Sequence, residues 1–317
     1  MIGKVPPSDL AAEVLPRTGE DDSAVRVGPA YGEDAAAIEV GGETLVVSTD
    51  PVSLATGRIG TLAVHIAAND IAASGGDPRW LTVVLFLPDR DALEPITRQL
   101  DDAAGAIGGV IVGGHSEFAA GRDRPLLVVT AMGLADRFVS TGGAEPGDRV
   151  VLAGAAGIEA TAILATDFRA DLDLPAELLD RGAAFFDDVG VLPAARAVRD
   201  RASAMHDPTE GGLVGGLFEL AAASGTHLEV EREAVPVREG TRRICGAAGV
   251  DPLRTFGSGA LVATVPDGEA DAAVAALEAA GIEAADIGAV RAGDPALVLD
   301  GEVVEEPVRD GLYPLFG

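Results

Sequence analysis

Short apolar stretches with the pattern of β-strands alternate along this chain with longer stretches that have the period of α-helices. In the first half the strand patterns cover 44–50, 80–88, 109–114 and 125–135, and the helix patterns lie within 61–80 and at 93–108. In the second half the strand patterns cover 149–154, 226–231 and 258–266, and the helix patterns cover 157–168, a stretch around 193–204, 212–224 and 269–281. This alternation predicts a mixed α/β fold made of two α+β halves.

Glycine, proline and polar residues gather at 138–150, in the stretch FVSTGGAEPGDRV. Such a cluster between two patterned regions is typical of a connection between domains. The chain has 317 residues, which is enough for two domains of ordinary size. We therefore expect an N-terminal domain at 1–140 and a C-terminal α/β domain at 141–317.

One predicted helix, within TLAVHIAANDIAASGG at 61–76, is apolar except for a few polar residues that include Asp70. A carboxylate buried in such a helix is costly unless it has a partner. Because Lys4 is the only lysine, that partner has to be a metal ion, an arginine or a cluster of polar groups. His65 and Asn69 lie four residues apart on one helical face, which is more typical of a hydrogen-bonded pair than of a metal site.

The charge of the chain excludes several classes of function. A net charge of −28, spread along the sequence, repels nucleic-acid phosphates and anionic membranes. An acidic chain this poor in lysine is typical of a halophile's high-salt cytoplasm. A P-loop needs a Gly-Lys-Ser/Thr sequence, which is absent here, and no internal lysine is available for Schiff-base chemistry. Cys245 is the only cysteine and no run is apolar enough for a signal peptide or a membrane span, so we expect a soluble cytoplasmic protein.

Acidic residues recur at predicted strand ends and glycine turns. Asp34 lies in YGEDAAAI, Asp50 in VVSTDPV and Asp207 in AMHDPTEGGL. Carboxylates at such places suit Mg²⁺, which prefers oxygen ligands. Asp50 and Asp207 also have an ordinary structural explanation, because an aspartate before proline often begins a turn and an aspartate before a helix often caps it. In a chain with 51 acidic residues, chance placement is a further alternative for each of the three. Asp70 is harder to explain in this way.

The order of these motifs resembles that of the aminoimidazole ribonucleotide synthetase (AIR synthase) superfamily. The matching stretches are YGEDAAA, STDP, NDIAASGG, GGHS and DPTEGGL, and the resemblance covers about 30–312. It is nearest to the branch of the hydrogenase maturation factor that dehydrates a carbamoylated cysteine. Selenophosphate synthetase and thiamine-monophosphate kinase are other members of the superfamily.

This resemblance implies two α/β domains and a homodimer whose N-terminal strands build a shared β-barrel. It also implies ATP bound with Mg²⁺, and phosphorylation of an oxygen of a small-molecule substrate. By their motif positions Asp34, Asp50, Asp70 and Asp207 match metal ligands of the family. The positions near the nucleotide are matched by Asn69, Gly113, Gly114, Gly211 and Gly212.

This sequence departs from the family pattern at several positions, which leaves the reaction and its catalytic residues open. His115 stands where several members carry an acid. We expect either that Glu117 replaces that metal contact or that His115 faces the substrate as an acid–base group, so His115 and Glu117 are the candidate catalytic residues. The maturation factor uses a cysteine at its extreme C-terminus, whereas Cys245 is internal, so we do not expect carbamoyl dehydration of that type. A non-catalytic nucleotide-binding relative is the main alternative. A nicotinamide oxidoreductase is a weaker alternative, because VVLAGAAGIEATAIL lacks the full Gly-x-Gly-x-x-Gly spacing. Which arginine faces the substrate is open among Arg122, Arg124, Arg169 and Arg254.

Overall fold

The structure is a computed structural model that describes residues 3–316, and its strands form two sheets. The first sheet has the order β1-β2-β3-β6-β4-β5 and the second the order β13-β12-β9-β11-β7-β10-β8. The strands are β1 (Val25–Val27), β2 (Ala36–Val40), β3 (Glu43–Val52), β4 (Asp77–Leu87), β5 (Val110–Phe118), β6 (Leu126–Ala135), β7 (Asp148–Gly154), β8 (Ala204–His206), β9 (His227–Val230), β10 (Ala260–Pro266), β11 (Ala284–Arg291), β12 (Ala296–Leu299) and β13 (Glu302–Val304). The mixed α/β fold predicted from the sequence is confirmed.

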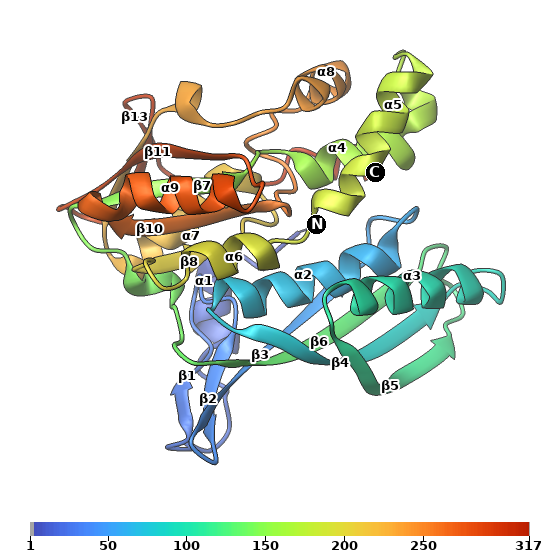
Figure 1. The fold of residues 1–317 in the computed structure, drawn as a ribbon. Coiled ribbons are helices and arrows are strands. Elements are labelled where there is room, and N and C mark those ends of the chain that lie inside the picture. The colour runs from blue at the N-terminus through green and yellow to red at the C-terminus, as the bar shows by residue number, and fades with distance from the viewer. Residues whose placement is uncertain (1–2, 317) are drawn as a thin grey trace.

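The helices cover the two sheets differently. They are α1 (Pro7–Asp9), α2 (Ile59–Ala73), α3 (Leu93–Ala106), α4 (Ile158–Thr166), α5 (Ala176–Ala183), α6 (Leu192–Val198), α7 (Gly212–Ser224), α8 (Glu239–Ala248) and α9 (Ala270–Ala279). Helices α2 and α3 lie on one face of the first sheet and leave its other face without a helix (Figure 1). The second sheet is covered on both faces, by α7 on one side and by α6 and α9 on the other. No helix of residues 3–316 has the length and apolar character needed to cross a membrane.

Helix α2 is the central element of the molecule. It is buried along nearly its whole length, and its apolar side chains pack against the first sheet, against α3 and, through Ala72 and Ala73, against the core beneath α6 and α9. A helix that is apolar on all sides has to be enclosed by other elements. Asp70 is therefore buried because the helix that carries it lies between the two halves of the protein.

The glycine pair 113–114 lies inside strand β5, which continues to Phe118 and so extends beyond the strand predicted at 109–114. The pairing of β4 with β5 shifts between Leu81 and Thr82, which leaves Val112 as an extra residue, a β-bulge. Gly114 has φ +149°, and a Cβ atom there would lie 1.8 Å from the carbonyl oxygen of Val83. The backbone geometry of the bulge alone is thus sufficient reason for a glycine at 114.

The predicted helix around 193–204 is wrong in its second part. Helix α6 ends at Val198, and Ala204–His206 form the edge strand β8. The amide of Ser203 donates to the carbonyl oxygen of Thr264 at 2.7 Å, so pairing with β10 draws the chain out of the helix. Helices α1, α5 and α8 and strands β1, β2, β11, β12 and β13 had no counterpart in the sequence prediction.

Candidate metal and nucleotide site

Three of the four predicted metal ligands come together where the two halves of the protein meet. One carboxylate oxygen each from Asp34, Asp70 and Asp207 lies within 4.8 Å of the others. Asp34 precedes β2, Asp70 belongs to α2, and Asp207 follows the edge strand β8. We call these three residues the carboxylate cluster. Ligands from both halves meet there because α2 packs against the second half.

The fourth predicted ligand, Asp50, lies beside this cluster within strand β3. Ser48 and Asp50 are two residues apart and therefore face the same side of the strand. The hydroxyl oxygen of Ser48 is 3.1 Å from a carboxylate oxygen of Asp50 and also contacts the carboxylate of Asp70. Ser48 thus connects Asp50 to the cluster, a contact that the sequence analysis did not foresee.

The cluster carries more negative charge than its protein neighbours compensate. Burial, and then the charges of Asp50 and Asp207, raise the pKa of Asp70 well above its usual value. Burial, and then the charge of Asp34, raise the pKa of Asp207 in the same way. Both carboxylate oxygens of Asp207 are buried and have no hydrogen-bond donor among the described residues. Buried polar atoms normally have partners, so this donor set fits a hard divalent cation such as Mg²⁺.

A buried histidine orients one member of the cluster. His206 Nδ1 lies 2.6 Å from Asp34 Oδ2, and His206 Nε2 lies 3.2 Å from Glu219 Oε2. Burial alone would lower the pKa of His206, but the two carboxylates outweigh burial and raise it to about 10. His206 is therefore an imidazolium that donates to both acids. Lys4 extends the chain of contacts, with its Nζ 2.9 Å from Glu219 Oε1.

The remaining predicted nucleotide residues have structural roles that the contacts define. The side-chain amide of Asn69 donates to Val189 O at 2.9 Å, and its oxygen accepts from Val191 N at 2.9 Å. Gly211 and Gly212 have φ of +81° and +62° at the start of α7. Gly211 N donates to the buried carboxylate of Asp310 at 2.8 Å. The predicted nucleotide contacts of these three residues, and of Gly113 and Gly114, stay predictions.

The predicted acid–base residues lie elsewhere in the chain. His115 and Glu117 are on the exposed edge strand β5, where His115 Nε2 is 3.2 Å from Glu117 Oε2. Strands β6 and β4 separate β5 from β3, which carries Asp50. Three strand spacings of about 4.8 Å each place His115 and Glu117 about 14 Å from the Asp50 end of the site. Within one chain they do not meet the carboxylate cluster, and their catalytic role stays a prediction.

Four other residues left open by the sequence analysis also have a defined place. Arg169 pairs with Asp180 at 2.8 Å, Arg254 lies 3.9 Å from Asp251, and Arg124 stacks over the ring of Phe316. Arg122 is exposed in the turn after β5.

Cys245 is buried beside Thr161, and burial raises the pKa of its thiol to about 11. A thiol in that state is not a nucleophile at neutral pH.

The buried acids make the stability of the metal-free protein depend on pH. Burial raises the pKa of Glu159 to about 7 and that of Asp310 to about 6. The folded state thus holds protons that the unfolded chain releases near pH 4, so we expect stability to fall as pH rises from about 4 to 7. The measurement is the melting temperature at pH 5 and pH 8 in molar KCl with EDTA. The Glu159→Gln variant should show a smaller drop, and a higher melting temperature at pH 8 than at pH 5 would contradict the assignment.

Comparisons with known proteins agree with this fold. Residues 32–135 match the family model described as AIR synthase related protein, N-terminal domain, and residues 145–300 match the model for its C-terminal domain. The chain is 33% identical to the carbamoyl dehydratase HypE of Rhizobium leguminosarum bv. viciae over 267 residues, which are 80% of this chain and 75% of that protein.

Two solved structures extend the comparison. A structure of the HypE–HypF complex matches with a TM-score of 0.77 and 25% identity, covering 94% of this chain and 99% of that one. A structure of the hydrogenase maturation protein HypE in complex with ATP matches with a TM-score of 0.70 and 28% identity, covering 92% of each chain.

Proposed function

The chain belongs to the family of AIR synthase-related proteins, in its HypE-like branch, and on this basis we propose that it is an ATP- and Mg²⁺-dependent enzyme. Its substrate would be a small molecule with an oxygen that accepts the γ-phosphoryl group. The observation that carries the proposal is the carboxylate cluster, in which both oxygens of Asp207 are buried without a donor. That its relatives are named as enzymes favours catalysis over a purely regulatory role.

In this proposal Asp34, Asp70 and Asp207 hold Mg²⁺, with Asp50 beside them through Ser48. A bound Mg²⁺ supplies neutralisation of the charge on the phosphate oxygens. His206 is a positioning residue, because its two hydrogen bonds keep the Asp34 carboxylate directed at the cluster. The bond between the γ-phosphorus and the β–γ bridging oxygen breaks, the acceptor oxygen bonds to that phosphorus and releases its proton to solvent, and ADP leaves.

The family resemblance also suggests a homodimer, and the exposed strand β5 supports this proposal. All nine residues of β5 are exposed, among them Val110, Val112 and Phe118, and the strand lies at an edge of the first sheet. Edge strands with exposed apolar side chains tend to pair with another chain. We infer that a second copy covers this edge and the open face beside it. Sedimentation in molar KCl should give twice the chain mass of 32.0 kDa, and a monomer at micromolar concentration would contradict the inference.

The experiment that tests the nucleotide site is a calorimetric titration of the protein with ATP in molar KCl, with and without Mg²⁺. We expect heat of binding only when Mg²⁺ is present, because the acidic cluster repels phosphates in the absence of the cation. Equal binding without Mg²⁺, or no binding in either condition, would contradict the proposal.

A further inference from the structure

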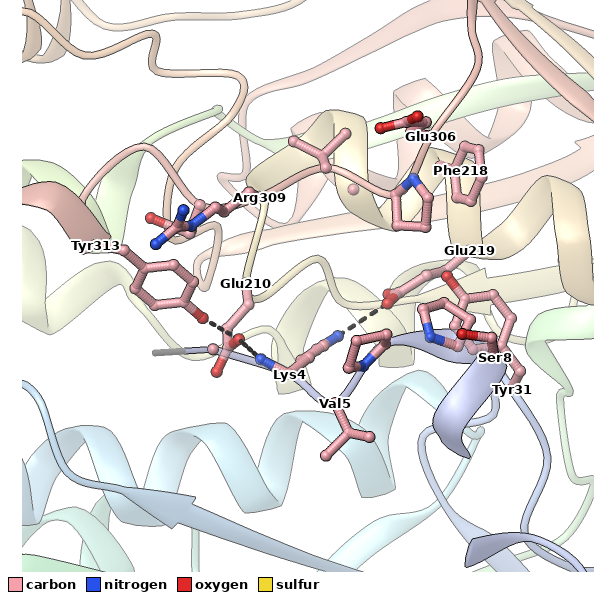
Figure 2. A pocket seen from close by; sticks show the side chains of 17 residues that line it. Lys4, Val5, Ser8, Tyr31, Glu210, Phe218, Glu219, Glu306, Arg309 and Tyr313 are labelled. Atoms are coloured by element: carbon pink, nitrogen blue, oxygen red, sulfur yellow. Dashed lines mark hydrogen bonds and ion pairs between the residues drawn. The ribbon is translucent and has the colours of Figure 1, made fainter. Parts of the chain in front are cut away.

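Lys4 is the only lysine in the chain, and it lies close to the proposed metal site. Residues 3–8 line a pocket together with helix α7 and the C-terminal residues 306–310 and Tyr313 (Figure 2). From this N-terminal segment the Lys4 side chain reaches Glu219 on α7. A chain with 51 acidic residues offers one lysine many partners, so its place beside this site calls for an explanation.

The N-terminal segment is held in place by its backbone as well as by the Lys4 side chain. The backbone amide of Lys4 donates to Glu210 Oε2 at 3.1 Å, and the same carboxylate oxygen accepts from the hydroxyl of Tyr313. Gly3 lies against the ring of Tyr313, where a Cβ atom would come within 2.7 Å of a ring carbon. Lys4 is therefore brought to Glu219 by contacts that do not involve its own side chain.

A continuous row of polar contacts leads from Lys4 to the carboxylate cluster. Lys4 Nζ donates to Glu219 Oε1 at 2.9 Å, and His206 Nε2 lies 3.2 Å from Glu219 Oε2. His206 in turn holds Asp34 through Nδ1 at 2.6 Å. The row runs inward, because the side chain of Lys4 is 50% exposed, that of Glu219 13% and that of His206 3%. Glu219 is thus the link between a half-exposed lysine and a buried histidine.

Both oxygens of Glu219 have a donor, one from each cation. Among the described residues, Lys4 is the donor to Oε1 and His206 is the donor to Oε2. Burial alone would raise the pKa of Glu219, but the hydrogen bond from His206 and the charge of Lys4 outweigh burial and lower the pKa to about 2. The last torsion of a glutamate side chain is broad, so a carboxylate that loses one of its two donors is free to turn. Without Lys4, the group that fixes the His206 ring would no longer be fixed itself.

We propose that Lys4 is a positioning residue of the metal site, which fixes Glu219 and, through Glu219 and His206, the carboxylate of Asp34. The N-terminal segment is then a functional part of the site, although it lies more than 200 residues from α7 in the sequence. This inference rests on the proposed function, because its test measures the affinity for Mg·ATP.

The first test replaces Lys4 by methionine, which keeps the length of the side chain and removes its charge. Partners that orient metal ligands typically contribute roughly 10–100-fold to affinity. Because Lys4 acts through Glu219 and His206, we expect a loss at the lower end, about tenfold in Mg·ATP affinity by calorimetry in molar KCl. The Lys4→Arg variant keeps a cation for Glu219 and should restore most of the affinity.

The matched control is Arg17→Met, which also removes one positive charge near the N-terminus. Arg17 is exposed and pairs with Glu13 at 3.0 Å. Its replacement should leave the affinity for Mg·ATP unchanged.

A double-mutant cycle tests whether Lys4 acts through Glu219. In the Glu219→Gln background, Lys4→Met should cause no further loss of Mg·ATP affinity, because the carboxylate that Lys4 fixes is already absent. If Lys4 instead attracted the phosphates directly, Lys4→Met would weaken binding by the same factor in both backgrounds. That result would overturn the proposal.

Chemical acetylation gives an independent test, because Lys4 carries the only side-chain amine. Acetylation with N-acetoxysuccinimide removes the charge of a lysine. The treated protein should bind Mg·ATP as weakly as Lys4→Met does, whereas the treated Lys4→Arg protein should keep its affinity. Unchanged affinity after complete acetylation of Lys4, shown by mass spectrometry, would contradict the proposal.

The outcomes separate this inference from the proposed function. If the original protein binds Mg·ATP and Lys4→Met binds it equally well, the inference is wrong and the proposed function stands. The same holds if Lys4→Met only lowers the urea concentration at which the protein unfolds, since Lys4 would then merely attach the N-terminal segment. If the original protein does not bind Mg·ATP, the proposed function fails and this inference fails with it.

Discussion

Replacing Asp207 by asparagine is expected to abolish Mg²⁺-dependent ATP binding, and replacing Asp70 should have the same effect. Each substitution removes one of three carboxylates that approach within 4.8 Å of one another. An amide is a neutral and weaker ligand for a hard cation. We expect a loss of at least about a hundredfold in Mg·ATP affinity, of the size that a bound metal contributes to holding phosphates. The measurement is the same calorimetric titration in molar KCl.

The same variants should be more stable than the original protein when no metal is present. Burial and neighbouring acids raise the pKa values of Asp70 and Asp207, which means that their ionised forms are destabilising in the folded protein. Asparagine has nearly the same shape and no charge, so the melting temperature in EDTA at pH 8 should rise in both variants. Mg²⁺ should then raise the melting temperature of the original protein and leave that of the variants unchanged.

The matched control is Asp123→Asn, an exposed aspartate in the turn between β5 and β6. It should change neither the affinity for Mg·ATP nor the melting temperature. A lower melting temperature in EDTA for Asp70→Asn and Asp207→Asn would show that these carboxylates stabilise the fold, and it would count against a metal site. Unchanged Mg·ATP affinity in both variants would have the same meaning.

The three members of the cluster were named from the sequence as metal ligands through the family resemblance, and the structure adds that they lie together. Asp70 is a carboxylate in an apolar helix, and Asp34 and Asp207 lie at turns next to strands. Residues whose role depends on pairing between distant segments were missed. Glu219 lies on α7 among mostly apolar neighbours, and only the fold brings it to His206 and to Lys4. Glu219 could have been singled out from the sequence, since a glutamate in so apolar a helix needs a partner for the same reason as Asp70.

The fold was predictable to a similar extent and for related reasons. Long helices and strands with strong apolar periodicity, such as α3 and β6, were found within a few residues of their ends. Short elements were missed where tertiary pairing decides the conformation, as at β8, which is held by β10. The strand predicted at 109–114 ends too early, because the sequence carries no sign of the bulge that Gly114 permits within β5. Local patterns do not record contacts of this kind.

Replacing Asn69 by alanine is expected to destabilise the protein by about 2–4 kcal/mol, because two buried backbone groups lose their partners. Its side chain joins α2 to the 189–191 loop of the second half, through Val189 O and Val191 N at 2.9 Å each. The neighbouring Asp70 is thereby held against Asp207, so the affinity for Mg·ATP should also fall several-fold. Urea unfolding measures the first effect and calorimetry the second.

Gln99→Ala is the matched control, since Gln99 also makes two backbone contacts, to Gly57 and Gly60, but within the first half and near the surface. It should cost less stability and leave Mg·ATP affinity unchanged. If Asn69→Ala unfolds at the original urea concentration, these two hydrogen bonds do not hold the halves of the site together.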